Sequence, residues 1–176
     1  METVYLGLGG NLLTPYTNIK KALSLLEDAE NIWINKISSF YQTSPVSPKK
    51  QEDYLNLVCS VETTLSPLAL LEKLEEIEKT LGKIAKGKND PRIIDIDILF
   101  FGEKNIDTKK LPIPHPEWKN RLFVLVPLSA ITPTIHLSNE VFDIKNLLEH
   151  SPFKAEHKIS LFKLKDLYEN SLYCQS

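Results

Sequence analysis

Two aspartates stand two positions apart in the stretch Ile93–Phe101, whose composition predicts a strand. Side chains alternate along a strand, so Asp95 and Asp97 are expected to face one side and the isoleucines between and around them the other. Aspartate is depleted in strands, and two neighbouring carboxylates repel each other. A divalent cation would relieve that repulsion, and magnesium typically takes one or two protein carboxylates plus substrate phosphates. The pair therefore predicts a magnesium site; the alternative is a solvent-facing strand whose acids serve solubility.

Arginine is rare in this chain. Of its 21 basic residues, only Arg92 and Arg121 are arginines. A guanidinium binds phosphate through two parallel N–H bonds, which an ammonium cannot do. Arg92 ends a basic loop just before Asp95, and Arg121 follows His115, which lies between two prolines. This arrangement predicts anion-binding groups beside the metal site, as a nucleoside triphosphate would need. The alternative is a solvated lysine-rich loop and a structural histidine.

Two further groups are less specific. Gly9-Gly10-Asn11 predicts a turn, and it is not a P-loop because the GxxxxGK[ST] pattern is absent. Several polar and aromatic residues have the types that line a pocket for a flat polar heterocycle, namely Tyr41, Thr43, Pro45, Tyr54 and Asn56. Taken alone, they are equally ordinary loop and strand residues.

Hydrophobic spacing and turn residues predict the elements that must position these groups. Strands are expected at Thr3–Leu8, Ile32–Tyr41, Tyr54–Thr64 and Ile93–Phe101. Helices are expected around Ile19–Leu26, from the cap Ser66 to the stop at Gly82, at Phe123–Ile131 and at Asp143–Leu148. Loops are expected at Gln42–Asp53, Lys83–Arg92 and the proline-rich Leu111–Arg121. Strands in pairs, without strict βαβ alternation, favour an α+β fold with a largely antiparallel sheet.

Length and composition bound the class of protein. The 176 residues are 42% hydrophobic and carry a net charge of −2. We expect one domain, 1–150, with 151–176 as a C-terminal extension or tail packed on it or linked to it. The near-neutral charge argues against a nucleic-acid partner. No apolar run of about 18 residues occurs, so no membrane partner is expected. The start shows no secretory signal, and the expected location is cytoplasmic.

From Tyr5 to about Pro133 the sequence resembles the hydroxymethyl-dihydropterin pyrophosphokinase family of folate biosynthesis. The most specific segments are Pro91–Leu99, the tripeptide Pro114-His115-Pro116, and the residues from Arg121 to Leu128. Leu8–Leu12 and a set comprising Tyr41, Thr43, Pro45, Gln51, Tyr54 and Asn56 are similar too. Several spaced motifs in the family's order are far more specific than any one of them.

The resemblance implies a ferredoxin-like α/β/α sandwich and an ATP-dependent pyrophosphokinase, a diphosphotransferase. It implies that the hydroxyl of 6-hydroxymethyl-7,8-dihydropterin attacks the β-phosphorus of ATP, giving AMP and the pterin diphosphate. It implies two Mg²⁺ ions held by Asp95 and Asp97, which form the catalytic set with Arg92 and Arg121. The implied ATP contacts are Glu75, Glu78, Lys83, Arg92, Ile98, Lys110, His115 and Arg121. The implied pterin contacts are Thr43, Pro45, Val46, Tyr54, Asn56 and Phe123.

ATP and the reduced pterin are thus the expected partners, and the resemblance leaves open fusion to, or association with, the next enzyme of the folate pathway. Two rival classes are less compatible with the residues. Nucleotidyltransferases place a glycine turn shortly before a paired-aspartate strand, whereas Gly10 and Asp95 are separated here by most of the domain. A ferredoxin-like regulatory or ligand-binding module would not need Asp95, Asp97 and two arginines together.

Overall fold

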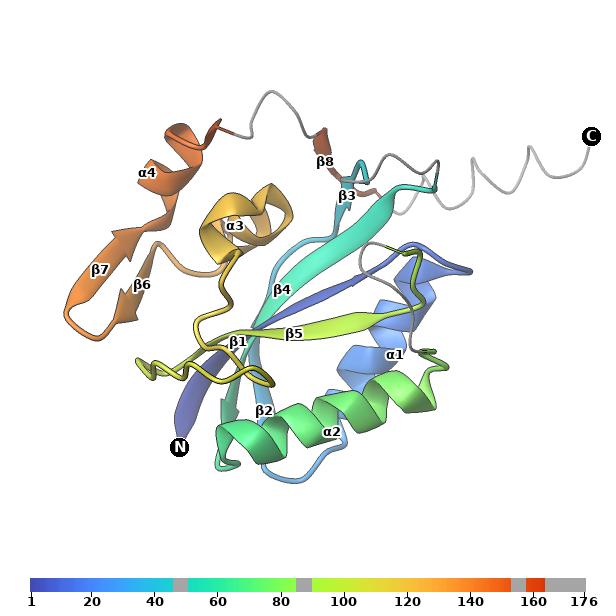
Figure 1. The fold of residues 1–176 in the computed structure, drawn as a ribbon. Helices are drawn as coiled ribbons and strands as arrows, with labels where there is room; N and C mark the ends of the chain where they lie inside the picture. The colour runs from blue at the N-terminus through green and yellow to red at the C-terminus, as the bar shows by residue number, and fades with distance from the viewer. Residues whose placement is uncertain (46–50, 85–89, 153–157, 164–176) are drawn as a thin grey trace, which may run out of the picture.

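The computed structural model describes residues 1–45, 51–84, 90–152 and 158–163 (Figure 1). Its strands are β1 (Glu2–Gly10), β2 (Ile32–Ile37), β3 (Tyr41–Thr43), β4 (Tyr54–Thr63), β5 (Asp95–Phe101), β6 (Thr134–Leu137), β7 (Glu140–Asp143) and β8 (Ile159–Leu161). Its helices are α1 (Pro15–Glu27), α2 (Pro67–Thr80), α3 (Leu122–Ser129) and α4 (Ile144–Glu149), with a 3-10 turn, η1 (Trp118–Asn120).

The larger sheet has six strands. Their order is β5-β1-β4-β3-β8, and β2 pairs with β4 beside the end of β3. Each of these pairs is antiparallel, as the sequence predicts. β6 and β7 form a separate hairpin. The sheet therefore brings β5, with its two aspartates, within one strand's width of β1 and two of β4.

Helices cover both faces of the sheet (Figure 1). α1 and α2 pack on one face over a core that includes Leu6, Leu57 and Ile96. α3 covers the other face, where Phe100, Trp118 and several α3 side chains form a second core. Burial of these two apolar surfaces drives the three-layer assembly. The architecture is the ferredoxin-like α/β/α sandwich predicted from the sequence.

α2 forms where its end signals predict. The Ser66 side chain accepts the Ala69 N–H at 3.3 Å, and Pro67 takes the first helical position. Leu70 and Leu74 are fully buried on the face that meets the sheet. Gly82 ends the helix with φ of +91°, a conformation that glycine adopts without strain. This end brings Lys83 up beside β5.

Two expectations for the local structure are wrong. Gly9 and Gly10 do not form a turn, because both lie within β1. The segment Ile32–Tyr41 is not one strand, because β2 ends at Ile37 and β3 begins at Tyr41. Ser38 interrupts it by accepting the Val58 N–H on its Oγ at 3.0 Å, so a side chain takes the place of the backbone partner. Gln42 and Thr43, expected in a loop, consequently belong to β3.

The chain after Ile131 holds structure that periodicity did not predict. It forms the β6–β7 hairpin before α4, and β8 then pairs with β3 at the edge of the main sheet (Figure 1). The division of the chain at residue 150 stays a prediction. In the part of the chain that the structure describes, no helix combines the length and the apolar content needed to cross a membrane.

Candidate active site

Strand register brings the candidate residues onto one face of the sheet. Asn56 on β4 pairs with Gly9 on β1, and Gly9 pairs with Asp95 on β5. Asp97 pairs with Gly7, two residues further along. Residues paired across strands, and residues two apart, share a face. The two aspartates and the Asn56 amide therefore project to the side that α3 covers, separated by glycines that have no side chain.

The glycines of β1 are required by close neighbours. A Cβ on Gly9 would lie 2.4 Å from Asn56 Oδ1, and a Cβ on Gly10 would lie 2.4 Å from the carbonyl oxygen of Ile93. The second contact is with backbone, which has little room to move. Gly9 thus leaves space for a side chain of the site, whereas Gly10 lets the segment before β5 approach β1.

A cavity of about 460 Å³ lies over this face of the sheet. The residues that line it include Gly7, Gly9, Thr43, Tyr54, Asn56, Arg92, Asp95, Asp97, Arg121 and Phe123. Asp95, Asp97 and Arg121 stand toward one end and Thr43 and Asn56 toward the other, with Arg92 and Tyr54 in contact between them. A volume of this order suits a small-molecule ligand.

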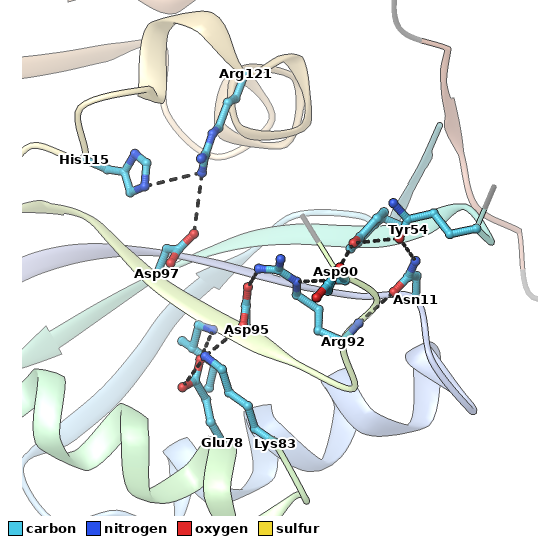
Figure 2. Close-up of polar contacts among 12 residues, drawn as sticks. Asn11, Tyr54, Glu78, Lys83, Asp90, Arg92, Asp95, Asp97, His115 and Arg121 are labelled. Atoms are coloured by element: carbon cyan, nitrogen blue, oxygen red, sulfur yellow. Dashed lines mark hydrogen bonds and ion pairs between the residues drawn. The ribbon is translucent and has the colours of Figure 1, made fainter. Parts of the chain in front are cut away.

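Asp95 is held by two cations. Its Oδ1 lies 2.8 Å from Lys83 Nζ, and its Oδ2 accepts from Arg92 Nη1 (Figure 2). Lys83 also lies 2.8 Å from Glu78 Oε2, and Glu78 Oε1 accepts the N–H of Ile96 at 2.7 Å. Glu78 is buried, and it satisfies the backbone donor between the two aspartates. A chain of alternating charge therefore runs from α2 to the cavity.

Burial and pairing shift the pKa values in this cluster. Burial raises the pKa of Glu78, although the hydrogen bonds from Lys83 and Ile96 act against it. Burial by itself would lower the pKa of Lys83, but hydrogen bonds to Asp95 and Glu78 bring it above its ordinary value. Burial also acts to lower the pKa of Arg92, but the hydrogen bond to Asp95 and the charge of that carboxylate raise it above its ordinary value. Both cations stay charged at neutral pH beside the carboxylate.

Asp97 faces Arg121, which approaches from the side opposite Lys83 and Arg92. Arg121 Nη1 lies 3.8 Å from Asp97 Oδ2 and 3.4 Å from His115 Nε2 (Figure 2). The Asp97 side chain is 47% exposed, so this ion pair is loose compared with that of Asp95. Arg121 also stacks over the Phe123 ring at 5.5 Å. The guanidinium is therefore positioned over the cavity while its own partner remains accessible to a ligand.

The tautomer of His115 follows from its backbone contact. The Glu117 N–H donates to Nδ1 at 3.1 Å, so the neutral ring carries its proton on Nε2. Burial lowers the pKa of His115, with Asp97 acting against that shift and Arg121 adding to it. A neutral ring at pH 7 then presents Nε2–H beside the Arg121 N–H groups. Donors that face each other in this way are suited to share an anionic acceptor.

The opposite end of the cavity is polar and ordered. Asn56 Nδ2 donates to Thr43 Oγ1 at 2.8 Å, and both side chains are buried. The Tyr54 hydroxyl lies 3.3 Å from Gln51 Oε1 and 3.3 Å from the carbonyl oxygen of Asp90. Burial raises the pKa of Tyr54, although Arg92 lowers it, and the hydroxyl remains a donor at neutral pH. Asn56 and Tyr54 both line the cavity.

Asn11 ties the two ends of the cavity together. Its Oδ1 accepts the Arg92 N–H at 3.0 Å, and its Nδ2 donates to Gln51 Oε1 and to the carbonyl oxygen of Glu52 (Figure 2). The N–H groups of Asn11 and Leu12 both donate to the carbonyl oxygen of Arg92. The buried Asn11 thus fixes the backbone that presents Arg92.

Not every residue expected at the site lines the cavity. Lys83 and His115 stand beside it, in contact with Asp95 and Arg121 respectively. Ile98 and Glu78 are buried on the helix side of β5, and Glu75 and Lys110 are exposed away from the cavity lining. Pro45 follows β3, and Val46 lies outside the described residues. The roles expected for these residues stay predictions.

Sequence reasoning missed other cavity residues, among them Gly7, Leu99, Asn120 and Ile159. Gly7 could have been found, because it alternates with Gly9 on a predicted strand and so shares its face. Nothing in the local sequence marks Ile159, whose position depends on pairing between distant segments.

The carboxylates of β5 have the chemistry to hold a divalent metal. Asp95 and Asp97 supply hard carboxylate oxygens on one face of β5, and Asp97 is accessible. Within the described ranges no cluster of three or more His, Cys, Asp or Glu side chains could hold an ion by itself. Two carboxylates fit a magnesium ion that takes its remaining ligands from water and substrate phosphates.

Comparisons with known proteins point to one family. The family pattern described as 7,8-dihydro-6-hydroxymethylpterin-pyrophosphokinase (HPPK) matches residues 5–133. The 2-amino-4-hydroxy-6-hydroxymethyldihydropteridine pyrophosphokinase of Haemophilus influenzae is 38% identical over 157 residues, which are 88% of this chain and 98% of that protein. The protein of the same name from Bacillus subtilis is 39% identical over 127 residues, or 72% of this chain and 76% of that one.

Longer relatives contain a similar segment. The "Bifunctional protein FolKE" of Lactococcus lactis subsp. cremoris is 43% identical over 128 residues, covering 73% of this chain and 37% of its own length. A solved structure titled HPPK-DHPS in complex with substrates aligns with a TM-score of 0.68 and 17% identity, over 93% of this chain and 48% of that one. This chain spans about half the length of that protein, and the likeness at this identity concerns the fold.

Proposed function

This chain belongs to the 7,8-dihydro-6-hydroxymethylpterin-pyrophosphokinase family, and from that membership we propose which of its residues carry the reaction. The reaction is pyrophosphoryl transfer from ATP to 6-hydroxymethyl-7,8-dihydropterin in folate biosynthesis. The observation that supports the assignment is a single cavity with paired aspartates facing arginines at one end and buried polar groups at the other. The triphosphate needs charged groups, and the pterin needs hydrogen-bonding groups, so the two substrates fit the two different ends.

Asp95 and Asp97 are the proposed Mg²⁺ ligands, with two ions shared between them and the triphosphate. When bound, the metal neutralises charge on the phosphate oxygens and holds them in place. Lys83 and Arg92, which neutralise Asp95 in the free protein, are then released from part of that role. Each of these cations then turns from the carboxylate toward a phosphate oxygen.

Arg92, His115 and Arg121 are the proposed triphosphate contacts. Arg92 approaches from the segment before β5, and Arg121 from the start of α3 on the other side of Asp97. The Nε2–H of His115 and the guanidinium of Arg121 share one phosphate oxygen. Such donors contribute by positioning and by charge stabilisation, which is most of what an enzyme supplies in phosphoryl-type transfer.

The pterin occupies the end where Thr43, Tyr54 and Asn56 lie, and Phe123 reaches it from α3, next to Arg121. The carbonyl oxygen of Asn56 accepts from the polar edge of the heterocycle, and its amide is held in that orientation by Thr43. Phe123 stacks on the ring, as aromatic faces do on flat heterocycles. The hydroxymethyl group then points toward the phosphates.

In the chemical step the pterin hydroxyl oxygen attacks the β-phosphorus. The new bond joins that oxygen to the β-phosphorus, and the bond from the β-phosphorus to the oxygen shared with the α-phosphate breaks. AMP leaves with the electron pair of that bond, and the hydroxyl proton passes to solvent or a phosphate oxygen. Arg92 and Arg121 stabilise the charge that builds up on the transferred group.

Product analysis tests this assignment. We expect the protein with ATP, Mg²⁺ and the reduced pterin to form AMP and a pterin diphosphate, with no AMP when the pterin or the metal is omitted. ADP as the product would indicate attack at the γ-phosphorus and contradict the proposal. Binding of ATP and pterin without turnover would point to a ligand-binding module instead.

Association with another folate-pathway enzyme and a cytoplasmic location are further proposals. Fusion occurs in relatives named as bifunctional proteins. Co-purification of this chain with the next enzyme of the pathway, together with fractionation of cells, would test both.

A further inference from the structure

β8 lies beside β3 at the end of the cavity opposite the aspartates (Figure 1). The Ser44 N–H donates to the carbonyl oxygen of Lys158 at 3.1 Å, and the Lys158 N–H donates to Ser44 Oγ at 3.2 Å. At the other end of β8, the Phe162 N–H donates to the carbonyl oxygen of Phe40 at 2.9 Å. The strand is thus bonded to β3 along its whole length.

The register decides where the side chains of β8 point. Ile159 pairs with Thr43, and Thr43 pairs with Tyr54 on β4. Paired residues share a face of the sheet, so Ile159 projects to the same side as these two proposed pterin contacts. It accordingly lines the cavity with them. Leu161, two residues on, shares that face but is 51% exposed and does not line the cavity.

β8 is also anchored on the opposite face. The ring of Phe162 lies 5.9 Å from that of Tyr16, which lies 4.9 Å from that of Phe40. These rings pack against the core beneath α1. The Phe162 side chain, just after β8, therefore anchors this end of the strand, while the hydrogen bonds to β3 fix the position of Ile159.

We propose that β8 is part of the pterin site and that Ile159 contacts the bound pterin. The side chain forms an apolar wall at the end of the cavity where Thr43 and Asn56 hold the polar edge of the ring. The family pattern ends at residue 133, so this contact comes from a part of the chain beyond it. The inference rests on the pterin site proposed above.

The test compares two truncations on one strand. Ile159→Ala removes the cavity side chain, and Leu161→Ala removes a similar side chain from the same face outside the cavity. We expect Ile159→Ala to weaken pterin binding and raise the pterin KM about three- to tenfold, as expected for lost apolar contact. Ile159→Val should fall between it and the wild type. ATP affinity should stay unchanged, and Leu161→Ala should stay within about twofold of the wild type throughout.

Pterin binding is followed by fluorescence titration, ATP binding by calorimetry, and folding by a thermal melt. Equal pterin affinity for Ile159→Ala and Leu161→Ala would overturn the proposal, as would a parallel loss of ATP and pterin affinity in Ile159→Ala. If Ile159→Ala melts early, Ile159→Val is compared with the wild type instead. An unchanged pterin affinity in Ile159→Val would then overturn the proposal. A wild-type protein that forms no AMP would instead refute the proposed function.

Discussion

At the scale of single residues, the site is a set of charges that are already paired before a ligand arrives. Asp95 is neutralised by Lys83 and Arg92, and Asp97 by a longer contact with Arg121. These cations screen the two aspartates from each other, so repulsion between the carboxylates destabilises the free protein little. A metal ion and a triphosphate bring in charges of both signs, so carboxylates and cations can exchange partners without leaving one unpaired.

Asp97→Ala should abolish most of the activity without harming the fold. Its carboxylate is half-exposed and loosely paired, so its removal leaves no buried charge alone. We expect turnover to fall by about a thousandfold or more, because Asp97 is one of the two proposed protein ligands of the metal. Rates measured at saturating Mg²⁺, with the exposed Asp107→Ala as control, check this. Near-normal turnover in Asp97→Ala would remove it from the metal site.

Arg92→Lys and Arg121→Lys should each lower turnover by about tenfold to a thousandfold, roughly 1.4 to 4 kcal/mol. Lysine keeps the charge but loses the planar fork that can bind a phosphate and a second partner together. Both arginines are partly exposed, so the melting temperature should hardly move. Kinetics and a thermal melt of both variants separate the outcomes. Early melting would make the arginines structural, and normal turnover would refute the phosphate contacts.

At the scale of elements, two strands and one helix place the aspartates. β5 has β1 on one side, and on the other side Glu78 from α2 accepts the N–H of Ile96. A buried carboxylate thus replaces a neighbouring strand at this point. On β1, Gly9 and Gly10 face opposite sides and have different neighbours, a side chain in one case and backbone in the other.

The two glycines should therefore respond differently to alanine. In Gly10→Ala the new methyl group meets the backbone of Ile93, and we expect a destabilisation of about 1–3 kcal/mol. In Gly9→Ala it meets the Asn56 amide, which can rotate away, so stability should change less. The expected loss there is in pterin affinity, because Asn56 is displaced from its contact with Thr43. Denaturant unfolding and pterin titration of both variants measure the contrast, and a reversed order of stabilities would contradict it.

At the scale of the whole molecule, the sandwich buries ionisable groups between its layers, and stability becomes linked to pH. His115 lies between β5 and α3, where burial lowers its pKa below the ordinary value of 6.5. The unfolded chain takes up a proton at this histidine before the folded chain does. Stability therefore falls as the pH drops below about 6.5, and this loss is absent above that pH.

His115→Gln should remove that contribution. The free energy of unfolding of the wild type, relative to the variant, should fall as the pH is lowered from 7.5 to 5 and stay level above 7. Denaturant titrations across this range check the prediction, since other titrating groups are common to both proteins. Two parallel stability curves would show that His115 titrates alike in the folded and unfolded chains.

The sequence by itself determined what depends on neighbours along the chain. The alternation of Asp95 and Asp97 with isoleucines follows from the two-residue period of a strand, and the start of α2 follows from Ser66 and Pro67. The restriction of arginine to two positions predicted anion-binding groups near the aspartates, and both arginines do line the cavity with them. The order of the motifs identified the family, and with it the fold and the reaction.

Only the tertiary structure decided what depends on residues far apart in the chain. Ser44 and Lys158 are 114 positions apart, and the β3–β8 pairing that their hydrogen bonds extend brings Ile159 to the cavity. Gly9 and Gly10 were expected in a turn, and only their pairing with β4, and that of Gly9 with β5, shows that the glycines belong to β1. Local propensities do not record such contacts, because the partner that imposes them is absent from the local sequence.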